Sequence, residues 1–458
     1  MENLDIQKSV SKRGKVLLIV NNYKFSFCDK LLNGESRVPK CNATIYTIGE
    51  DFLISRHNLI HSYEELSKSA LQKQFVAVAA KRKASEDIGL QPKRIIHSVL
   101  KENESDQLTI DEVKSVKRSI YGERRKKFPK LPKSCLESHC ALEDIKEKII
   151  TNRKEFFLMI NDIESNIIIF SCDVNLKHLC RCTRIFMDGT FKYCPKYFLQ
   201  LFTLHGYYNG HYIPLAFCLL KDKLTETYAK CLTILLNKCK EINLKFQPEE
   251  IVIDFEKSIH NAVKIVWNEV KIIGCRFHIS QAWWRKVQEL GLSKDYKERT
   301  EVGKWIGYCF GLLFLEPESV GDCLVFELNE IRPHNQQLEK FLDYLVETYI
   351  DDDAPFPPKI WASKSACSRR TTNACESFHA HLNKCFNFSN PNIFVFLDII
   401  QNYQSEIYIQ IQSIHTKKTP NIRTQKRENY LKEKIKQLDD NQITRLHFIK
   451  LTSHYFSF

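Results

Sequence analysis

Apolar and polar positions form a regular succession of short blocks over the middle of the chain, and this succession predicts a sheet with interleaved helices. Strand-like apolar runs occupy residues 185–187, 198–208 and 212–220, and two more occupy 251–253 and 270–273. Between the two groups, apolar residues recur at helical spacing on one face, at Tyr228, Leu232, Leu235, Leu236 and Cys239. This order of elements predicts an α/β core, with a central mixed sheet flanked by helices.

The second and third of these strands are separated by Asn209 and Gly210. Both residue types tolerate the positive φ of a tight primed turn, so the pair predicts a β-hairpin. Few strand-like runs follow His278, and the later pattern is mainly helical. The sequence therefore places its predicted strands before the long helical part.

The N-terminal part of the chain changes composition between two successive stretches. Residues 1–66 carry strand-like runs at 16–20, 23–27 and 44–47, bracketed by turn residues, and predict a small β-rich module. Residues 67–150 are polar, basic and helix-prone. This second stretch predicts a basic helical unit, which could be a DNA-binding arm or a solvated linker.

The remaining boundaries follow from the helical pattern. We expect the α/β domain to span residues 151–402, with an all-helical insertion at about 291–370. Residues 403–458 are rich in Lys, Glu and Gln, and predict a charged helical tail. The chain shows no internal repeat.

Size and charge narrow the class of protein. The 458 residues suffice for two or three domains. There are 68 Lys and Arg against 55 Asp and Glu, and the formal net charge of +13 favours a polyanionic partner such as nucleic acid. The 17 cysteines follow no disulfide framework and are interpreted as reduced intracellular thiols. No apolar stretch reaches the roughly 18 residues of a membrane span, so no membrane partner is expected.

The basic stretch contains one dense run of positive side chains. The candidate DNA-binding residues are Arg124, Arg125, Lys126, Lys127 and Lys130. Runs of like charge are also common on faces that are merely solvated, and that alternative stays open. The same run is a weak nuclear-import signal, so a nuclear location is expected.

Two aspartates follow short apolar runs, and this placement points to metal chemistry. Asp188 and Asp254 would lie at strand ends near the middle of one sheet. Hard divalent cations such as Mg²⁺ take carboxylate oxygens, and a pair of such cations can activate a nucleophile and stabilise a leaving oxygen at a phosphodiester. Glu376 is the best candidate for a third carboxylate. Such sites usually need three.

Each of the three acids also has an ordinary structural explanation. Asp188 precedes Gly189 and could make a turn. Asp254 could cap the helix that follows it, and Glu376 could close a capping box with Asn373. Spacing alone does not decide between these roles and catalysis.

Four segments in one order resemble the MULE (Mutator-like element) transposase domain. They are residues 186–191, 253–256, 274–278 and 372–377, and the resemblance runs from about residue 184 to 402. The resemblance implies a ribonuclease-H-like fold whose acidic triad binds Mg²⁺ or Mn²⁺ for DNA cleavage and strand transfer. Carried over by position, the triad is Asp188, Asp254 and Glu376. The long interval between the last two resembles the helical insertion of such transposases.

Cys275 and His278 form the Cys-x-x-His element that this family also has after the second acid. The pair could ligate a structural metal or shape the wall of the site, but two ligands do not close a zinc site. A buried thiol and a hydrogen-bonded imidazole are the simpler interpretation. The adjacent Trp283 and Trp284 could stack on bases, although core packing by at least one is favoured.

The N-terminal module contains the segments 13–15, 23–25 and 41–43 and the pair His57 and His61. Together they resemble a FLYWCH-type zinc finger, which implies zinc held by two Cys and two His. The candidate ligands are Cys41, His57 and His61, with Cys28 as a substitute for a missing thiolate. The module departs from the pattern, because residues 37–40 replace the expected Trp-x-Cys and three residues separate the two histidines. Structural zinc is almost always four-coordinate, so zinc binding stays open.

Three hypotheses for the whole protein result. In the first, it is a DDE-type transposase that acts on double-stranded DNA, at transposon terminal repeats, as a homo-oligomer in the nucleus. In the second, it is a domesticated, catalytically inactive DNA-binding regulator derived from a transposase. The third is an unrelated zinc hydrolase that uses Cys275 and His278, and it lacks a third ligand nearby.

Overall fold

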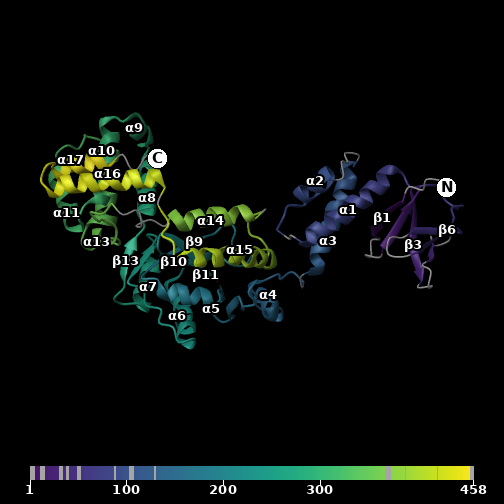
Figure 1. The fold of residues 1–458 in the computed structure, drawn as a ribbon. Coiled ribbons are helices and arrows are strands. Elements are labelled where there is room, and N and C mark those ends of the chain that lie inside the picture. Colours follow the sequence, from purple (N-terminus) through teal and green to yellow (C-terminus); the bar gives the residue numbers. More distant parts are fainter. Residues whose placement is uncertain are drawn as a thin grey trace. The chain divides into compact units, whose positions relative to one another are not determined.

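The computed structural model forms two compact units, residues 1–131 and 132–458, which are described separately. It describes residues 6–10, 16–29, 35–37, 41–48, 53–86, 89–102, 108–127, 130–366, 373–386, 388–419 and 421–453. Figure 1 labels many of the elements of both units. The chain is mixed α/β, with a large mixed sheet, many helices and a β-rich N-terminal region, as the sequence predicts.

The first unit begins with a six-stranded antiparallel meander in the order β1-β2-β3-β4-β5-β6. Its strands are β1 (Ile6–Val10), β2 (Val16–Val20), β3 (Tyr23–Asp29), β4 (Glu35–Arg37), β5 (Thr44–Ile48) and β6 (Leu53–Asn58). The three strands predicted from the sequence are confirmed as β2, β3 and β5. Buried side chains between them form a small core, which comprises Leu18, Val20, Phe25, Cys41, Ala43 and Ile45.

Three helices complete this unit: α1 (Lys68–Glu86), α2 (Pro92–Glu102) and α3 (Ile110–Lys127). They bury a separate small core, made by Val76, Ala80, Ala84, Ile95, Ile96, Val99, Val116 and Ile120. Aliphatic residues at helical spacing on each element face this core, which explains why the polar stretch still folds as three packed helices.

The second unit contains a seven-stranded mixed sheet in the order β13-β12-β9-β10-β11-β8-β7. The strands are β7 (Leu158–Asp162), β8 (Ile167–Phe170), β9 (Arg184–Thr190), β10 (Gln200–Tyr208), β11 (His211–Leu220), β12 (Glu250–Ile253) and β13 (Lys271–Gly274). The five predicted strands are confirmed, and β7 and β8 extend the sheet beyond them. Strands β9, β12 and β13 run parallel, whereas β9, β10 and β11 pair antiparallel.

The hairpin between β10 and β11 has the expected turn chemistry. Asn209 has φ 49 and Gly210 has φ 88, so both turn residues adopt the left-handed conformation. A side chain at Gly210 would also meet the backbone oxygen of Lys418. The turn therefore needs glycine for two reasons.

Helices cover both faces of the sheet. On one face lie α6 (Thr225–Glu241) and α7 (Lys257–Val266), where Phe202 of β10 packs on Tyr228 at a ring-centroid distance of 5.2 Å. On the other lies α14 (Asn373–Cys385), where Phe217 of β11 packs on Phe378 at 6.0 Å. Helices α5 (Asp173–Arg181) and α15 (Ile393–Ser413) contact β11, and α4 (Cys135–Asp144) contacts β7. Buried apolar runs on β10 and β11 fit a sheet that is covered on both sides.

A helical part follows β13 and has a core of its own. It comprises α8 (Arg276–Glu289), α9 (Ser293–Glu298), α10 (Glu301–Gly311), α11 (Pro317–Asp322), α12 (Gln336–Leu345) and α13 (Pro358–Trp361). Fully buried Trp283, Trp305 and Trp361 anchor this core. Trp283 is thus a core residue, as the sequence favoured, while Trp284 is half-buried against Tyr296.

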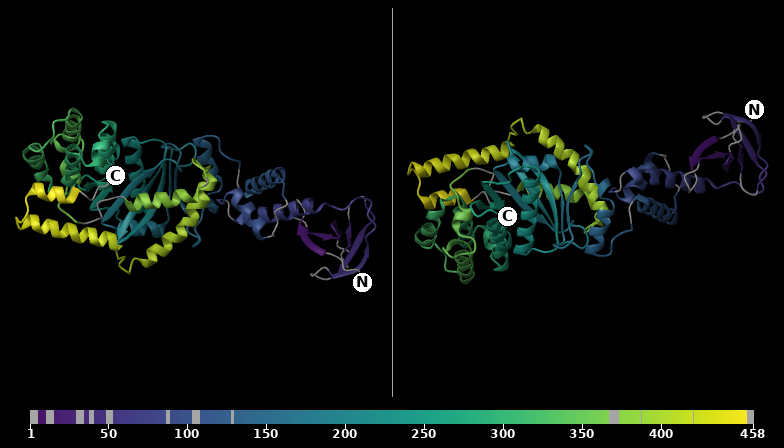
Figure 2. Two further views of the ribbon diagram at one scale, coloured as in Figure 1. Left: turned by 90° about the horizontal axis from the view of Figure 1, so that it is seen from above. Right: turned by 90° about the horizontal axis from the view of Figure 1, so that it is seen from below.

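The C-terminal helices complete the helical part. Figure 2 shows α16 (Ile422–Asp439) and α17 (Arg445–Thr452), in yellow, beside the green helices of this part. Leu431, Phe448 and Ile449 are buried in the same core as the three tryptophans. The boundary expected at residue 402 falls within α15. Among the described residues, no helix combines the length and apolar character that crossing a bilayer requires.

Candidate active site

The sheet brings Asp188, on β9, close to Asp254, which directly follows the adjacent parallel strand β12. The paired residues of β9 and β12 are Arg184 with Glu250, Ile185 with Ile251, and Phe186 with Val252. Continued by two residues, this register places Asp188 beside Asp254, and both side chains line one small cavity. Neighbouring strands are about 4.8 Å apart and alternate residues share a face, so both carboxylates project to the same side.

Neither aspartate has the ordinary role that the sequence left open for it. Asp188 lies within β9 and does not form a turn with Gly189. Helix α7 begins after Glu256 without a side-chain cap, so Asp254 is not its capping residue. Each carboxylate instead accepts a hydrogen bond from the next backbone N–H, with N to Oδ1 distances of 2.9 Å at Asp188 and 2.5 Å at Asp254.

Helix α14 carries the third acid over the sheet. Cys375, Phe378 and Leu382 are buried and hold one face of the helix against the sheet. Glu376 and His379 lie one turn apart on this helix, so they point to the same region. The side chain of Asn373 lies outside the described residues, and so does the capping box that it would form with Glu376.

Two histidines connect the three acids. His278 Nε2 lies 3.0 Å from Glu376 Oε1, and Nδ1 of the same ring lies 3.6 Å from Asp254 Oδ1. His379 Nδ1 lies 3.2 Å from Asp188 Oδ2, and both of these side chains are buried. The fold therefore gathers Asp188, Asp254 and Glu376 at one place, with an imidazole against each.

The charge state of His278 follows from its surroundings. Its side chain is 14% exposed, and burial acts against the charged form of the ring. Interactions with Cys275, Glu376 and Asp254 outweigh burial and raise the pKa of His278 to about 11. At neutral pH an imidazolium therefore bridges two of the three acids.

The donor set suits a hard divalent cation in its chemistry, because all three acids offer carboxylate oxygens. Within the described part of the chain, however, no three His, Cys, Asp or Glu side chains converge closely enough to hold a metal ion. The His278 imidazolium keeps Asp254 and Glu376 engaged with itself. The three acids lie near one another, but their oxygens do not form a preorganised metal-coordination shell.

A small cavity of about 60 Å³ opens beside the two aspartates. Glu256 and Lys223 line it and form an ion pair, with Lys223 Nζ 2.6 Å from Glu256 Oε2. The Lys223 ammonium also lies 4.5 Å from the ring centroid of Phe191. The sequence had not singled out Glu256, although it follows Asp254 by only two residues.

Cys275 is buried in a core cluster with Cys375, Phe186 and Val252. It precedes α8, so the Cys-x-x-His spacing places His278 in the first turn of that helix. Among the described residues, neither side chain belongs to a group that could hold a metal ion. The Cys-x-x-His motif therefore connects the end of β13 to His278, whose side chain contacts Asp254 and Glu376.

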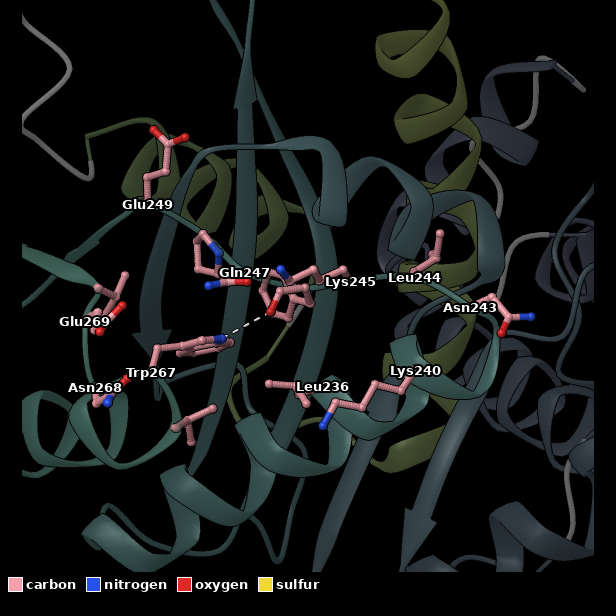
Figure 3. A pocket seen from close by; sticks show the side chains of 14 residues that line it. Leu236, Lys240, Asn243, Leu244, Lys245, Gln247, Glu249, Trp267, Asn268 and Glu269 are labelled. Carbon is pink, nitrogen blue, oxygen red and sulfur yellow. Dashed lines mark hydrogen bonds between the residues drawn. The ribbon is translucent and has the colours of Figure 1, made fainter.

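A larger hollow, of about 910 Å³, lies at the other end of the same strands. Figure 3 shows its lining, with residues 243–249 before β12 and Trp267, Asn268 and Glu269 before β13. Trp267 Nε1 donates to the backbone oxygen of Phe246 at 3.1 Å. β12 begins at this hollow and leads to Asp254 at its far end, and β13 leads to Cys275.

The candidate zinc ligands of the first unit are only partly assembled. Cys41 Sγ lies 3.8 Å from His61 Nδ1, and the His61 ring stacks on Tyr23 with centroids 3.5 Å apart. His57 lies on β6 with an exposed side chain. The side chain of Cys28 lies outside the described residues. The described residues of this unit hold no group of three metal-binding side chains.

The basic run ends helix α3. Arg124 is half-buried and donates a hydrogen bond to the backbone oxygen of Leu90, which lies between α1 and α2. This bond joins the end of α3 to the segment that connects the other two helices. Arg125, Lys126 and Lys130 are exposed, and Lys126 pairs with Glu123 at 2.9 Å. The side chain of Lys127 lies outside the described residues.

Comparison with known proteins identifies the segment that carries the aspartates. Residues 184–282 match the family model of the MULE transposase domain. The matched segment begins at β9, contains Asp188, Asp254 and His278, and ends within α8. No curated protein matches the chain. The match supports a MULE transposase-type protein with a transposase-type function, and it implies DNA binding.

Proposed function

We propose that this chain is, or descends directly from, a DDE-type transposase whose Asp188, Asp254 and Glu376 bind Mg²⁺ or Mn²⁺ and cleave and join DNA strands. The observation that carries the proposal is that Asp188 on β9 and Asp254, directly after the parallel strand β12, line the same cavity. The match to the MULE transposase domain covers both residues. Glu376 lies outside the matched segment, so its assignment to the triad depends on its contact with His278.

A ribonuclease-H-like core is part of this proposal. The mixed sheet has parallel strands β9, β12 and β13 at one side and the antiparallel strands β10 and β11 at the other. Helices cover both faces of the sheet, and α14 carries His379 and Glu376 to the carboxyl ends of β9 and β12. Ligands of such open sheets commonly bind beyond the carboxyl ends of the strands.

The chemistry would be in-line attack on a phosphodiester, first by water and then by the freed 3′-hydroxyl. Bound metal would activate the attacking oxygen and stabilise the leaving oxygen. Asp188 is already oriented by Gly189 and His379. Asp254 and Glu376 would have to release His278 before both could serve as ligands. No side chain of the protein needs to become covalently attached to DNA.

The same proposal extends to the partners. Double-stranded DNA, at transposon terminal repeats, would be held through its phosphates by exposed basic residues such as Arg125, Lys126 and Lys130. Joining two element ends requires two active sites, so a homo-oligomer in the nucleus is proposed. A zinc-bound FLYWCH-type finger in residues 1–66 is proposed as a second DNA contact.

A catalytically inactive, DNA-binding regulator is the second candidate. The observation that favours it is the pair of contacts that His278 makes with Asp254 and Glu376, which occupy both carboxylates, and the raised pKa of His278 fits this role. Such a protein would keep the fold and the DNA contacts but not cut. Both candidates share the transposase-type core.

Nicking of supercoiled DNA distinguishes the two candidates. Wild type is compared in Mg²⁺, in Mn²⁺ and in a chelator with Asp188→Asn, Asp254→Asn and Glu376→Gln. The exposed carboxylate variant Asp322→Asn serves as the matched control. If the protein is a transposase, nicking should depend on metal, and each triad variant should lower the nicking activity more than about 100-fold. Substitution of residues that only support metal ligands already lowers activity about 10–100-fold. Equal nicking by all variants removes the catalytic role, and DNA binding without wild-type cleavage supports the regulator.

A further inference from the structure

The geometry points to His379 as a positioning residue that fixes the Asp188 carboxylate by donating from Nδ1, with its tautomer set by Thr203 and His205. This inference rests on the proposed function, because it concerns how one metal ligand of that site is oriented. No sequence pattern indicated a role for His379. Its place one turn after Glu376 connects it to the same helix.

The four side chains form one buried chain of contacts. His379 Nδ1 lies 3.2 Å from Asp188 Oδ2, and Nε2 of the same ring lies 2.9 Å from Thr203 Oγ1. His205 Nε2 lies 3.0 Å from the same hydroxyl oxygen. Thr203 is the residue on β10 directly opposite Asp188. All four residues are buried, so solvent does not compete for these contacts.

The positions of the protons follow from the inventory of donors and acceptors. Burial and the neighbouring His379 lower the pKa of His205 well below its usual range, so its ring is neutral and carries one proton. Nδ1 of His205 has no hydrogen-bond partner among the described residues. A buried N–H without a partner is rare, which favours the proton on Nε2, where it is donated to Thr203.

The hydroxyl of Thr203 then has one proton to donate. Its two remaining neighbours are His379 Nε2 at 2.9 Å and the backbone oxygen of Asp188 at 3.2 Å. The shorter contact favours donation to His379 Nε2. That assignment makes Nε2 of His379 an acceptor, so the ring proton lies on Nδ1, directed at Asp188 Oδ2.

The consequence is a carboxylate held at both oxygens. Oδ1 of Asp188 accepts from the backbone N–H of Gly189 at 2.9 Å, and Oδ2 accepts from His379. Each oxygen keeps lone-pair capacity for a metal ion, while rotation of the group is restricted. Contacts of this kind behind a metal ligand typically contribute 10–100-fold to metal affinity.

A merely structural role for His379 makes a different prediction. If the ring only fills space between α14 and the sheet, any side chain of similar size should serve. Asn places its amide nitrogen near the position of Nδ1, whereas Gln places it near Nε2. His379→Asn therefore retains the donor to Asp188, and His379→Gln retains only the contact with Thr203.

Titration of the full-length chain with Mn²⁺ alone tests the inference. We expect His379→Gln and His379→Ala to weaken Mn²⁺ binding by about 10–100-fold and His379→Asn to stay within about threefold of wild type, as fits a retained hydrogen bond. The control is His139→Asn, a buried histidine of α4 that bonds Asn161. Thermal unfolding of each variant shows that it is folded at the temperature of titration.

Two results overturn the inference: Mn²⁺ affinity of His379→Ala equal to that of wild type, or equal losses in the Asn and Gln variants. Failure of wild type to bind Mn²⁺ removes the proposed function instead. In that case ¹⁵N signals of the His379 imidazole still decide the inference, since a proton on Nδ1 supports it and a proton on Nε2 overturns it.

Discussion

His278 Nε2 lies 3.0 Å from Glu376 Oε1, although 98 positions of sequence and the helices α9 to α13 separate them. This contact joins the start of α8 to the start of α14 above the ends of β9 and β12. It explains how a carboxylate so distant in sequence reaches two strand-end aspartates. It also places a positive charge among them, since the pKa of His278 is raised to about 11.

The raised pKa of His278 predicts a pH dependence of stability. In the unfolded chain a histidine loses its proton near pH 6.5, whereas folded His278 keeps its proton up to about 11. The stabilisation is therefore fully present below pH 6.5 and is lost as pH rises toward 11. Between pH 7.5 and 9.5, with chelator present, the free energy of unfolding should fall more steeply for wild type than for His278→Gln. The difference should be up to about 1.4 kcal/mol per pH unit, which corresponds to one proton.

Urea denaturation of both proteins across this pH range measures the difference directly. The comparison with His278→Gln removes the contributions of other titrating groups. Parallel curves for the two proteins mean that His278 is neutral in the fold.

The basic end of α3 should contribute to DNA binding through its exposed side chains. Neutralising Arg125, Lys126 and Lys130 should weaken binding to DNA of any sequence. If all three contact phosphates, the slope of log affinity against log salt should become shallower by about 2.7. Arg124→Ala should instead lower stability by about 1 kcal/mol, because its hydrogen bond to Leu90 is lost.

Fluorescence anisotropy over a series of salt concentrations checks the first effect, and thermal unfolding checks the second. If the slope of log affinity against log salt is unchanged in the triple variant, these basic residues do not contact DNA. They are then either only solvated or part of a nuclear-import signal.

The N-terminal module should bind one zinc ion if the finger is intact. Cys41 and His61 are already neighbours, so Cys41→Ser and His61→Ala should each abolish the zinc content of the full-length chain. His57→Ala should do the same only if its exposed ring turns toward Cys41. Elemental analysis of the purified protein measures the stoichiometry. A value near zero in a folded wild-type protein removes the finger.

Trp283 and Trp284 should differ in what their removal affects. Trp283 is fully buried among Phe310, Tyr349 and Trp361, so Trp283→Ala should lower the free energy of unfolding by about 3–5 kcal/mol. Trp284→Ala should cost less, because its ring is only half-buried. Urea denaturation and DNA binding are measured on both. A stable Trp283→Ala protein that has lost DNA binding contradicts the core assignment.

The centre of the sheet is predictable from the sequence because each signal for it lies within a few neighbouring residues. The runs before Asp188 and Asp254 and the turn at Asn209 and Gly210 each lie within a few residues. Together they indicate the four strands β9, β10, β11 and β12 at the centre of the sheet. The edge strand β7 and its neighbour β8 went unrecognised, although β8 is a fully buried run of four residues.

Long-range contacts were beyond the reach of sequence patterns. His379 meets Asp188 across 191 positions, and neither residue carries a signal for the other. The C-terminal helices looked exposed because Lys and Glu dominate them, yet Phe448 and Ile449 complete the core of the helical part. A few buried residues on a charged helix are enough to dock it, and composition averages hide them.

The location of bound Mn²⁺ tests the central claim most directly. Crystals of the full chain in Mn²⁺ should give an anomalous scattering peak about 2.2 Å from carboxylate oxygens of both Asp188 and Asp254, with His278 turned away from Glu376. The same crystals of Asp188→Asn should lose that peak. Saturating Mn²⁺ that leaves the His278 bridge intact, with no peak between the two aspartates, would contradict the account.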